Sequence, residues 1–219
     1  MTQIKRIDGS IIAESDTLTL VALVELNKAN LSEANLSGEN LSGADLSEVN
    51  LYKADLSRAN LSRVDLYKTN LSVANLSEAY LHNADLSRAN LSEVNLYKAD
   101  LSRANLSEAD LSKADLYKAN LSKANLYNAD LSNADLSWAN LSGTYLSEAK
   151  GIVLLGPAPT SGRIGYCVDH GDKIMVKLGC WWSELEDTLD RISEKHPGEK
   201  GEAYADMVKA AARSLEVAR

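Results

Sequence analysis

The sequence predicts a solenoid, a rod built from one short repeat whose chain turns a corner every five residues, with a small non-repetitive unit at each end. Leucine occupies every fifth position from Leu31 to Leu146, which is 24 consecutive placements. The residue just before these leucines is Asn or Asp in 22 of the 24 repeats, and the residue two before is Ala in 18. Residues 1–25 and 151–219 lack this pattern. A fixed short period is typical of repeat architectures.

The five-residue period excludes a regular helix and a flat strand as the repeating element. At about 100° per residue a helix would place successive leucines on all its faces, and a strand would send alternate leucines to opposite sides. A chain that bends at each repeat instead points every leucine the same way. Small Ala side chains suit the inside of a bend, and Asn or Asp side chains bond to nearby backbone and favour turns.

The repeats Ala-Asp-Leu-Ser-Arg at 54–58 and Ala-Asn-Leu-Ser-Glu at 104–108 resemble the pentapeptide-repeat family, and the resemblance covers residues 24–150. It implies a mainly β fold, a right-handed quadrilateral parallel β-helix with one pentapeptide per side and about 20 residues per coil. It also implies that Leu and the Ala two before it fill the interior. Positions separated by four repeats would then stack on one side, with about 4.8 Å between coils. Small α+β caps are expected at both ends, because such a rod must hide its unpaired edges.

Residues 1–25 are expected to form the N-terminal cap, and residues 26–150 the β-helix. The segments 4–7 and 10–13 are typical of a β-hairpin around the Asp8-Gly9 turn. A short helix through Leu18–Val24 follows and would lie on the first coil, with Ser15 or Asp16 as its N-cap.

Residues 151–162 are expected to be a linker, because they contain the run Gly156–Gly162, which is rich in Pro, Ser and Gly. Residues 163–219 are expected to form a small ββαα domain that docks on the last coil. Its strands are predicted at 163–168 and 173–178, followed by a helix that a capping box at 183–186 opens and a second helix at 202–217. The layout, with the Leu178–Trp182 run, resembles pentapeptide-repeat proteins carried by bacteriophages and prophages.

Composition excludes several classes of protein. The chain carries 23 Lys plus Arg against 31 Asp plus Glu, a net charge of −8, which argues against direct binding to nucleic acid or to an anionic membrane. No stretch of about 18 apolar residues is present, so no membrane-spanning helix is expected. Two cysteines are too few for a disulfide framework. These features predict a cytoplasmic protein, and the resemblance to phage-carried proteins implies that the cytoplasm is that of a bacterial host cell.

No catalytic motif is present. The many serines recur after the repeat leucines as part of the surface, and three histidines cannot act as general bases for all of them. We therefore expect a non-enzymatic protein without a cofactor. Cys167, His170 and Cys180 are the weak candidates for a metal site. Their spacing lacks the paired cysteines of common zinc modules, which favours a buried apolar Cys and a turn His.

A stripe of Tyr and Lys residues is the candidate binding surface on the rod. Tyr97 and Tyr117 are separated by four repeats and are each followed by Lys, at Lys98 and Lys118. They would stack on one side of the rod. Cross-coil packing that shields the surface strands is the alternative interpretation, and we favour it.

The leading functional hypothesis is a protein-interaction or scaffold module that binds an unidentified host protein through its ends, and the second resemblance suggests that it is phage-encoded. Residues 46–62 and 91–107 are identical but offset by nine repeats, so they would fall on different sides, which suggests that much of the rod is a spacer. Trp181 and Trp182 are the candidate anchors, since Trp is enriched in binding hot spots. The alternative places them in the core of the small domain. A homodimer through a terminal cap is a further option.

Two other hypotheses stay open. The resemblance raises a DNA mimic that inhibits DNA gyrase or another topoisomerase, because some relatives imitate duplex DNA. Residues 26–150 contain 16 acids and 12 bases, whereas about 30 Å of duplex carries about 17 phosphate charges. One side is also expected to carry Arg63, Arg103 and Lys123 at its outermost position without an acid there. The third hypothesis is a metal- or ligand-binding C-terminal domain.

Overall fold

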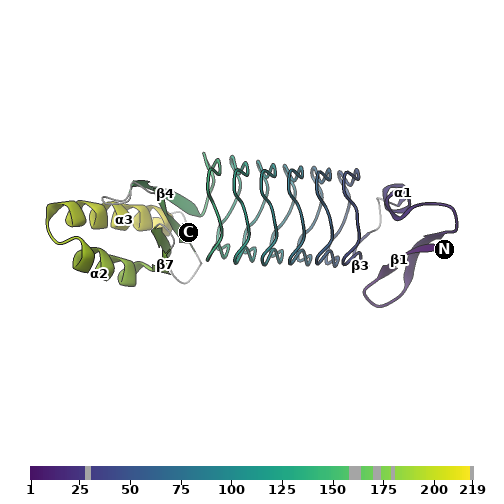
Figure 1. Cartoon of the computed structure of the whole chain (residues 1–219), viewed down its shortest axis with the longest axis horizontal. Helices are drawn as coiled ribbons and strands as arrows, with labels where there is room; N and C mark the ends of the chain where they lie inside the picture. The colour runs from purple at the N-terminus through teal and green to yellow at the C-terminus, as the bar shows by residue number, and fades with distance from the viewer. Residues whose placement is uncertain (28–30, 158–163, 170–173, 179–180, 218–219) are drawn as a thin grey trace.

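The chain forms a long rod with a different cap at each end (Figure 1). The computed structural model describes residues 1–27, 31–157, 164–169, 174–178 and 181–217. A hairpin and one helix cover the N-terminal end of the rod, and a small sheet with two helices covers the other end (Figure 1). The repeats lie between them as a stack of coils.

Each coil consists of four pentapeptides and pairs with the next coil on four sides. Parallel bridges join the residue before each repeat leucine to its equivalent four repeats later, from Asn35 and Asp55 to Asp130 and Lys150. Every pairing is one isolated bridge, because the chain turns again after each short contact. The rod is therefore a repeat β-helix with four contacts between successive coils. The right-handed sense implied by the resemblance stays a prediction.

Every backbone N–H of a typical repeat has an acceptor, which explains the residue pattern. In the repeat 74–78, the N–H of Asn75 donates to Ala54 O of the preceding coil (2.9 Å), and those of Leu76 and Glu78 donate to the following coil (2.7 and 2.8 Å). The N–H of Ser77 donates to the Asn75 side chain (3.2 Å). The next Ala closes the turn on Leu76 O (3.1 Å). Asn or Asp is thus favoured before Leu, because its side chain accepts from the N–H of the residue after Leu. The bend turns this N–H away from both neighbouring coils.

The interior is a column of leucine with alanine at the corners. The leucines from Leu31 to Leu141 are at most 1% exposed, and the alanines two before a repeat leucine are equally buried from Ala34 to Ala139. Thr69 is a polar residue at one of these alanine positions. Its buried hydroxyl donates to Leu46 O (2.8 Å), so its hydrogen-bonding group is satisfied. The expectation that Leu and Ala fill the interior is confirmed.

Each corner requires a left-handed residue. The residue two after each repeat leucine has φ between 53° and 71° throughout 33–148, whether it is Gly, Lys, Glu or Trp. A positive φ at the third residue of a turn is the mark of a type II turn. This constraint was not predicted, because the side chains at the corner positions show no preference for Gly or Asn.

The N-terminal cap contains a hairpin of β1 (Thr2–Arg6) and β2 (Ile11–Ser15) and a helix, α1 (Leu20–Leu26). Strand β1 also pairs with β3 (Ala34–Asn35) of the first coil, which covers one exposed edge. The Glu25 carboxylate accepts from Asp45 N–H (2.9 Å), where a preceding coil would supply a carbonyl. The helix is capped by Thr19, whose hydroxyl accepts from Ala22 N–H (3.2 Å).

The two N-cap residues expected for this helix were therefore wrong. Ser15 instead accepts from the N–H groups of Thr17 and Leu18 (3.2 and 3.1 Å) in a turn that precedes the helix. The helix begins after this turn, where Thr19 has the extended backbone of an N-cap.

The C-terminal cap is a four-stranded antiparallel sheet with two helices on it. The strands run in the order β4 (Ile152–Pro157), β5 (Ile164–Asp169), β6 (Ile174–Leu178) and β7 (Trp181–Glu184). The helices are α2 (Leu185–Lys195) and α3 (Glu199–Val217). The sheet thus has two more strands than expected. The first of them, β4, lies in the segment expected to be a linker, because its apolar residues 152–155 pair with β5.

The capping box expected at 183–186 was also wrong. Glu184 is the N-cap residue of α2 and makes no side-chain hydrogen bond to the helix. The Ser183 hydroxyl contacts that of Thr188 instead (2.6 Å). The sheet continues through Ser183, which places this residue in a strand rather than at a helix start.

The C-terminal cap docks on the last coil. Tyr166 donates its hydroxyl to Leu141 O (3.2 Å), and Lys177 donates its ammonium to Ala139 O (2.7 Å). Asp169 N–H donates to Gly151 O (3.0 Å), where the rod passes into β4. Ile152 and Val168 join the leucine core of the rod. The sheet therefore closes the open end of the β-helix.

Candidate interaction face

One side of the rod differs from the other three in charge. Equivalent positions of successive coils stack on one another. Each side of the rod is therefore a column of short segments, which we call rungs, and each rung runs from one left-handed corner residue to the next. We call one side the basic face, defined by the rungs 38–43, 58–63, 78–83, 98–103, 118–123 and 138–143. It carries six bases and three acids. Each corner residue belongs to the two sides that meet there and is counted on both. Over residues 33–153, each of the other three sides then carries five bases and six acids.

The basic residues occupy both corners of the same rungs. One rung has Arg58 and Arg63 at its two corners, another has Lys98 and Arg103, and the next has Lys118 and Lys123. All six side chains are exposed. The corner position projects them outward because its left-handed backbone forms the outer edge of the turn. The strand between the two corners is thus flanked by cations.

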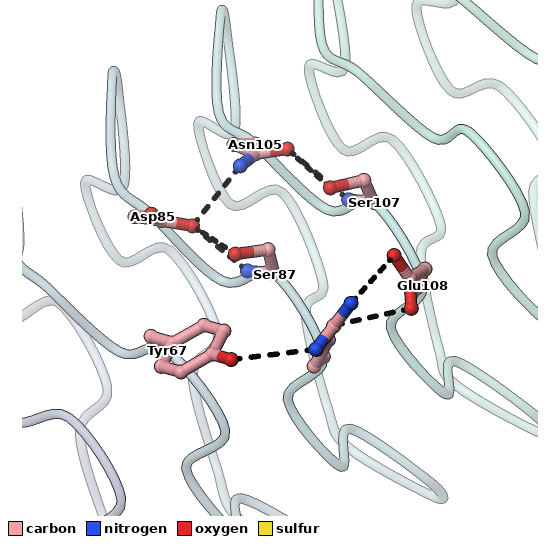
Figure 2. Close-up of polar contacts among 7 residues, drawn as sticks. Tyr67, Asp85, Ser87, Asn105, Ser107 and Glu108 are labelled. Carbon is pink, nitrogen blue, oxygen red and sulfur yellow. Dashed lines mark hydrogen bonds and ion pairs between the residues drawn. The ribbon is translucent and has the colours of Figure 1, made fainter.

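Neighbouring sides neutralise their charges along the stack. Arg88 pairs with Glu108 one coil later through two nitrogen–oxygen contacts of 3.1 and 3.2 Å (Figure 2). Beside this pair, Asn105 donates its amide to Asp85 (3.1 Å), so that carboxylate is also engaged (Figure 2). Lys113 pairs with Glu93 on another side (3.1 Å). Such exposed pairs add little stability but cancel the local field.

The basic face lacks this neutralisation over most of its length. Arg58 pairs with Glu78 (3.0 Å). Among the residues that the structure describes, Arg63, Arg103 and Lys123 have no carboxylate within 4.0 Å. The acid at the centre, Asp100, accepts from Asn120 (2.9 Å) and from a backbone N–H (3.1 Å). The face therefore keeps a net excess of three positive charges, and its corner column of Arg63, Arg103 and Lys123 contains no acid.

A tyrosine interrupts the turn pattern at the middle of this face. Tyr80 stands where most repeats have Asn or Asp, and its side chain is 55% exposed. It cannot supply the carboxamide or carboxylate acceptor that the N–H two residues later normally uses. Within the described part of the chain, His82 N–H has no hydrogen-bond acceptor. The basic face thus carries the exposed ring of Tyr80 and, among the described residues, a backbone N–H at His82 without an acceptor.

The Tyr–Lys stripe predicted from the sequence lies on the neighbouring side. The rings of Tyr97 and Tyr117 stack at 5.9 Å with an interplanar angle of 4°. Lys98 and Lys118 place their ammonium groups 4.9 and 4.8 Å from the centroids of the tyrosines that precede them. Hydrogen bonding to Tyr97 raises the pKa of Lys98. The faces of the two tyrosine rings are therefore occupied by each other and by the lysines. The ammonium groups of Lys98 and Lys118 lie at the corner that this side shares with the basic face.

Trp138 continues this corner column, and it was not among the residues predicted from the sequence. It occupies the position one coil after Lys118 and is 56% exposed. Its φ of 62° places a bulky aromatic residue in the left-handed region, which L-residues other than Gly and Asn seldom adopt. Comparing equivalent corner positions of successive coils would have identified it.

The candidates in the C-terminal cap are less informative. Cys167 is buried in β5, where its thiol lies 3.9 Å from Val208 O, and burial raises its pKa to about 12. His170 and Cys180 lie outside the described residues. In residues 1–27, 31–157, 164–169, 174–178 and 181–217, no three His, Cys, Asp or Glu side chains are grouped to hold a metal ion. Trp181 and Trp182 belong to β7, and their side chains are outside the described part.

Comparison with known families identifies the class of protein. The model of pentapeptide repeats matches eight copies, over residues 25–63, 54–92, 74–112 and 109–148. These ranges cover more than half of the chain, and the chain belongs to the pentapeptide repeat family. Members of this family are generally non-enzymatic structural or interaction modules.

Solved structures give the particular proteins to which the chain is similar. HetL, a pentapeptide repeat protein involved in heterocyst differentiation regulation in the cyanobacterium Nostoc sp. strain PCC 7120, is 34% identical over 52% of this chain and 71% of its own, with a TM-score of 0.27. A pentapeptide repeat protein of the Arabidopsis thaliana thylakoid lumen is 29% identical over 46% and 67%, with a TM-score of 0.27. QnrB1, a plasmid-mediated fluoroquinolone resistance protein, is 22% identical over 53% and 78%, with a TM-score of 0.23. A search of curated proteins found no match.

No helix among the described residues is both long enough and apolar enough to cross a membrane.

Proposed function

We propose that the protein is a non-enzymatic protein-interaction module whose basic face contacts a partner protein. The observation that carries this proposal is the exposed Trp138 on the same corner column as Lys98 and Lys118. Tryptophan is enriched among residues that dominate binding energy, and it is highly buried on average in folded proteins. The rod holds it on a rigid frame, so little side-chain order has to be acquired on binding.

Affinity capture from bacterial lysate with the full chain tests this proposal. Trp138→Asn removes the ring, and Asn tolerates the left-handed backbone. Val73→Asn is the matched control, because Val73 is also exposed (43%) at a corner with φ 61° on another side of the rod. We expect a partner that is lost with Trp138→Asn and retained with Val73→Asn. A partner retained equally by both variants, or no partner for the unchanged chain, would overturn the proposal.

The ends of the rod are a second place for contacts. The phage-encoded origin and a host partner bound through Trp181 and Trp182 stay predictions. Changing both residues to Ala and repeating the capture tests the anchor role, with circular dichroism to check that the C-terminal cap is folded. Sedimentation tests a homodimer through a cap, and metal analysis of the purified protein tests a metal-binding C-terminal domain.

Mimicry of DNA is less well supported by the charge arrangement. A mimic must display acids with the regularity of phosphates, about one charge per 1.7 Å. On this rod Glu78, Glu93 and Glu108 pair with bases, and one side carries a basic excess. A gyrase supercoiling assay with the purified protein decides the question, and we expect no inhibition at micromolar concentrations.

A further inference from the structure

We propose that the basic face recognises an acidic α-helix of the partner, laid along the axis of the rod. This inference rests on the proposed function and gives the chemistry of the partner surface. It follows from the spacing of the cations, from the groups between them and from the charge of the rest of the chain.

The spacing of the cations matches that of side chains on a helix. Coils repeat about every 4.8 Å along the rod, so Lys123, Arg103 and Arg63 lie at about 0, 5 and 14 Å. A helix rises 1.5 Å per residue, so positions i, i+3 and i+10 lie at about 0, 4.5 and 15 Å and within about 80° of one another around the helix. Acidic residues at these positions would each meet one cation. Lys98 and Lys118 repeat the one-coil spacing along the opposite corner.

The aromatic and polar groups of this face suit the apolar edge of such a helix. Tyr80 projects from the rung between Arg63 and Arg103, and Trp138 stands one coil beyond Lys118. Both rings are more than half exposed. His82 N–H, which lacks an acceptor among the described residues, can donate to a carboxylate. Aromatic anchors with cations around them are what a partner with mixed acidic and apolar side chains requires.

The charge outside this face favours a protein partner over duplex DNA. The chain as a whole has a net charge of −8, and each of the other three sides has an acidic excess. The unpaired cations extend over only about four coils, roughly 15 Å. A duplex continues its charge beyond the length of the patch, whereas a short acidic helix confines its charge to the patch.

The direct test measures binding of labelled peptides to the full chain at low ionic strength by fluorescence anisotropy. The probe is an Ala-rich helical peptide with Glu at i, i+3, i+7 and i+10, and its control is a peptide of equal composition with the Glu residues spread around the helix. The variant pair is Arg103→Glu with Lys123→Glu. The control pair is Lys53→Glu with Lys113→Glu, which makes the same charge change at left-handed corners of other sides.

We expect the one-sided peptide to bind more tightly than the spread peptide, with affinity falling about tenfold in the first variant pair and less than about twofold in the control pair. Affinity must also fall as salt rises. Equal losses in the two pairs, no binding of the one-sided peptide, or tighter binding of a short duplex DNA would each overturn the inference. Thermal melts of all variants confirm that the fold is retained.

The same charge variants separate this inference from the proposed function. If lysate capture depends on Trp138 but not on Arg103 and Lys123, the protein-interaction function stands and the acidic helix is wrong. If the unchanged chain captures no partner, the proposed function fails whatever the peptides do.

Discussion

Gly151 is the residue at which the rod becomes the C-terminal cap, and Gly151→Ala should weaken that junction strongly. Its φ is +75°, and an added Cβ would lie 2.6 Å from both Leu131 C and Leu131 O. A left-handed L-residue costs about 1–2 kcal/mol, and forcing a methyl group against backbone costs about 1–3 kcal/mol. The lower entropy of the unfolded alanine chain returns about 0.4–1 kcal/mol. We therefore expect a loss of about 3 kcal/mol in the free energy of unfolding, in a range of about 1 to 4.6 kcal/mol.

Gly143→Ala is the matched control for this prediction. Gly143 has φ +71°, but its added Cβ would meet only Lys123 Cγ, at an ordinary 3.5 Å. Gly143→Ala should lower the free energy of unfolding by about 1 kcal/mol, because it strains the left-handed backbone but its Cβ does not overlap other atoms. Urea unfolding followed by circular dichroism compares the two variants. Equal free-energy losses would refute the reasoning, because they would show that the close approach to Leu131 does not constrain the junction.

Three further predictions concern the core, the turn pattern and the buried thiol. Leu91→Ala, at a site with no exposed surface, should lower the free energy of unfolding by about 2–5 kcal/mol in the same urea assay, because the stacked coils leave a cavity. Tyr80→Asn should raise it by about 0.5–1.5 kcal/mol by giving His82 N–H an acceptor, and unchanged stability would contradict this account of the turn. In a Cys180→Ser background, Cys167 should not react with a thiol reagent at pH 8 until the protein is unfolded, since its raised pKa of about 12 keeps the thiol protonated.

The repeat could be predicted from the spacing of one residue type, and the core and the stacking of equivalent positions in successive coils could be predicted from the resemblance to the pentapeptide-repeat family. Leu71 and Leu91, at positions separated by four repeats, belong to the same buried cluster. The caps were harder to predict. Strand β4 was expected to be a linker, because its pairing with β5 depends on a tertiary contact. Thr19 was missed as an N-cap because several polar residues precede the helix and local sequence does not rank them.

The candidate site shows the same division. Lys98 and Lys118 were identified, and so was the absence of acids beside Arg103 and Lys123 at the outermost position. These two sets border one strand, and Trp138, which lies 20 residues after Lys118, extends one of them; it was missed because equivalent corner positions were not compared from coil to coil.

The sequence by itself determined that the chain turns at every fifth residue, because a strict period imposes the same local geometry at every repeat, and its resemblance to the pentapeptide-repeat family implied the four-sided stack with a leucine core. Only the tertiary structure decided which charged side chains of successive coils come within ion-pair distance of each other. Arg88 finds Glu108 in the next coil, whereas Arg103 and Lys123 find no carboxylate among the described residues. Pairing depends on the residue one coil away and on the direction in which a left-handed corner projects its side chain, and both are properties of the folded stack.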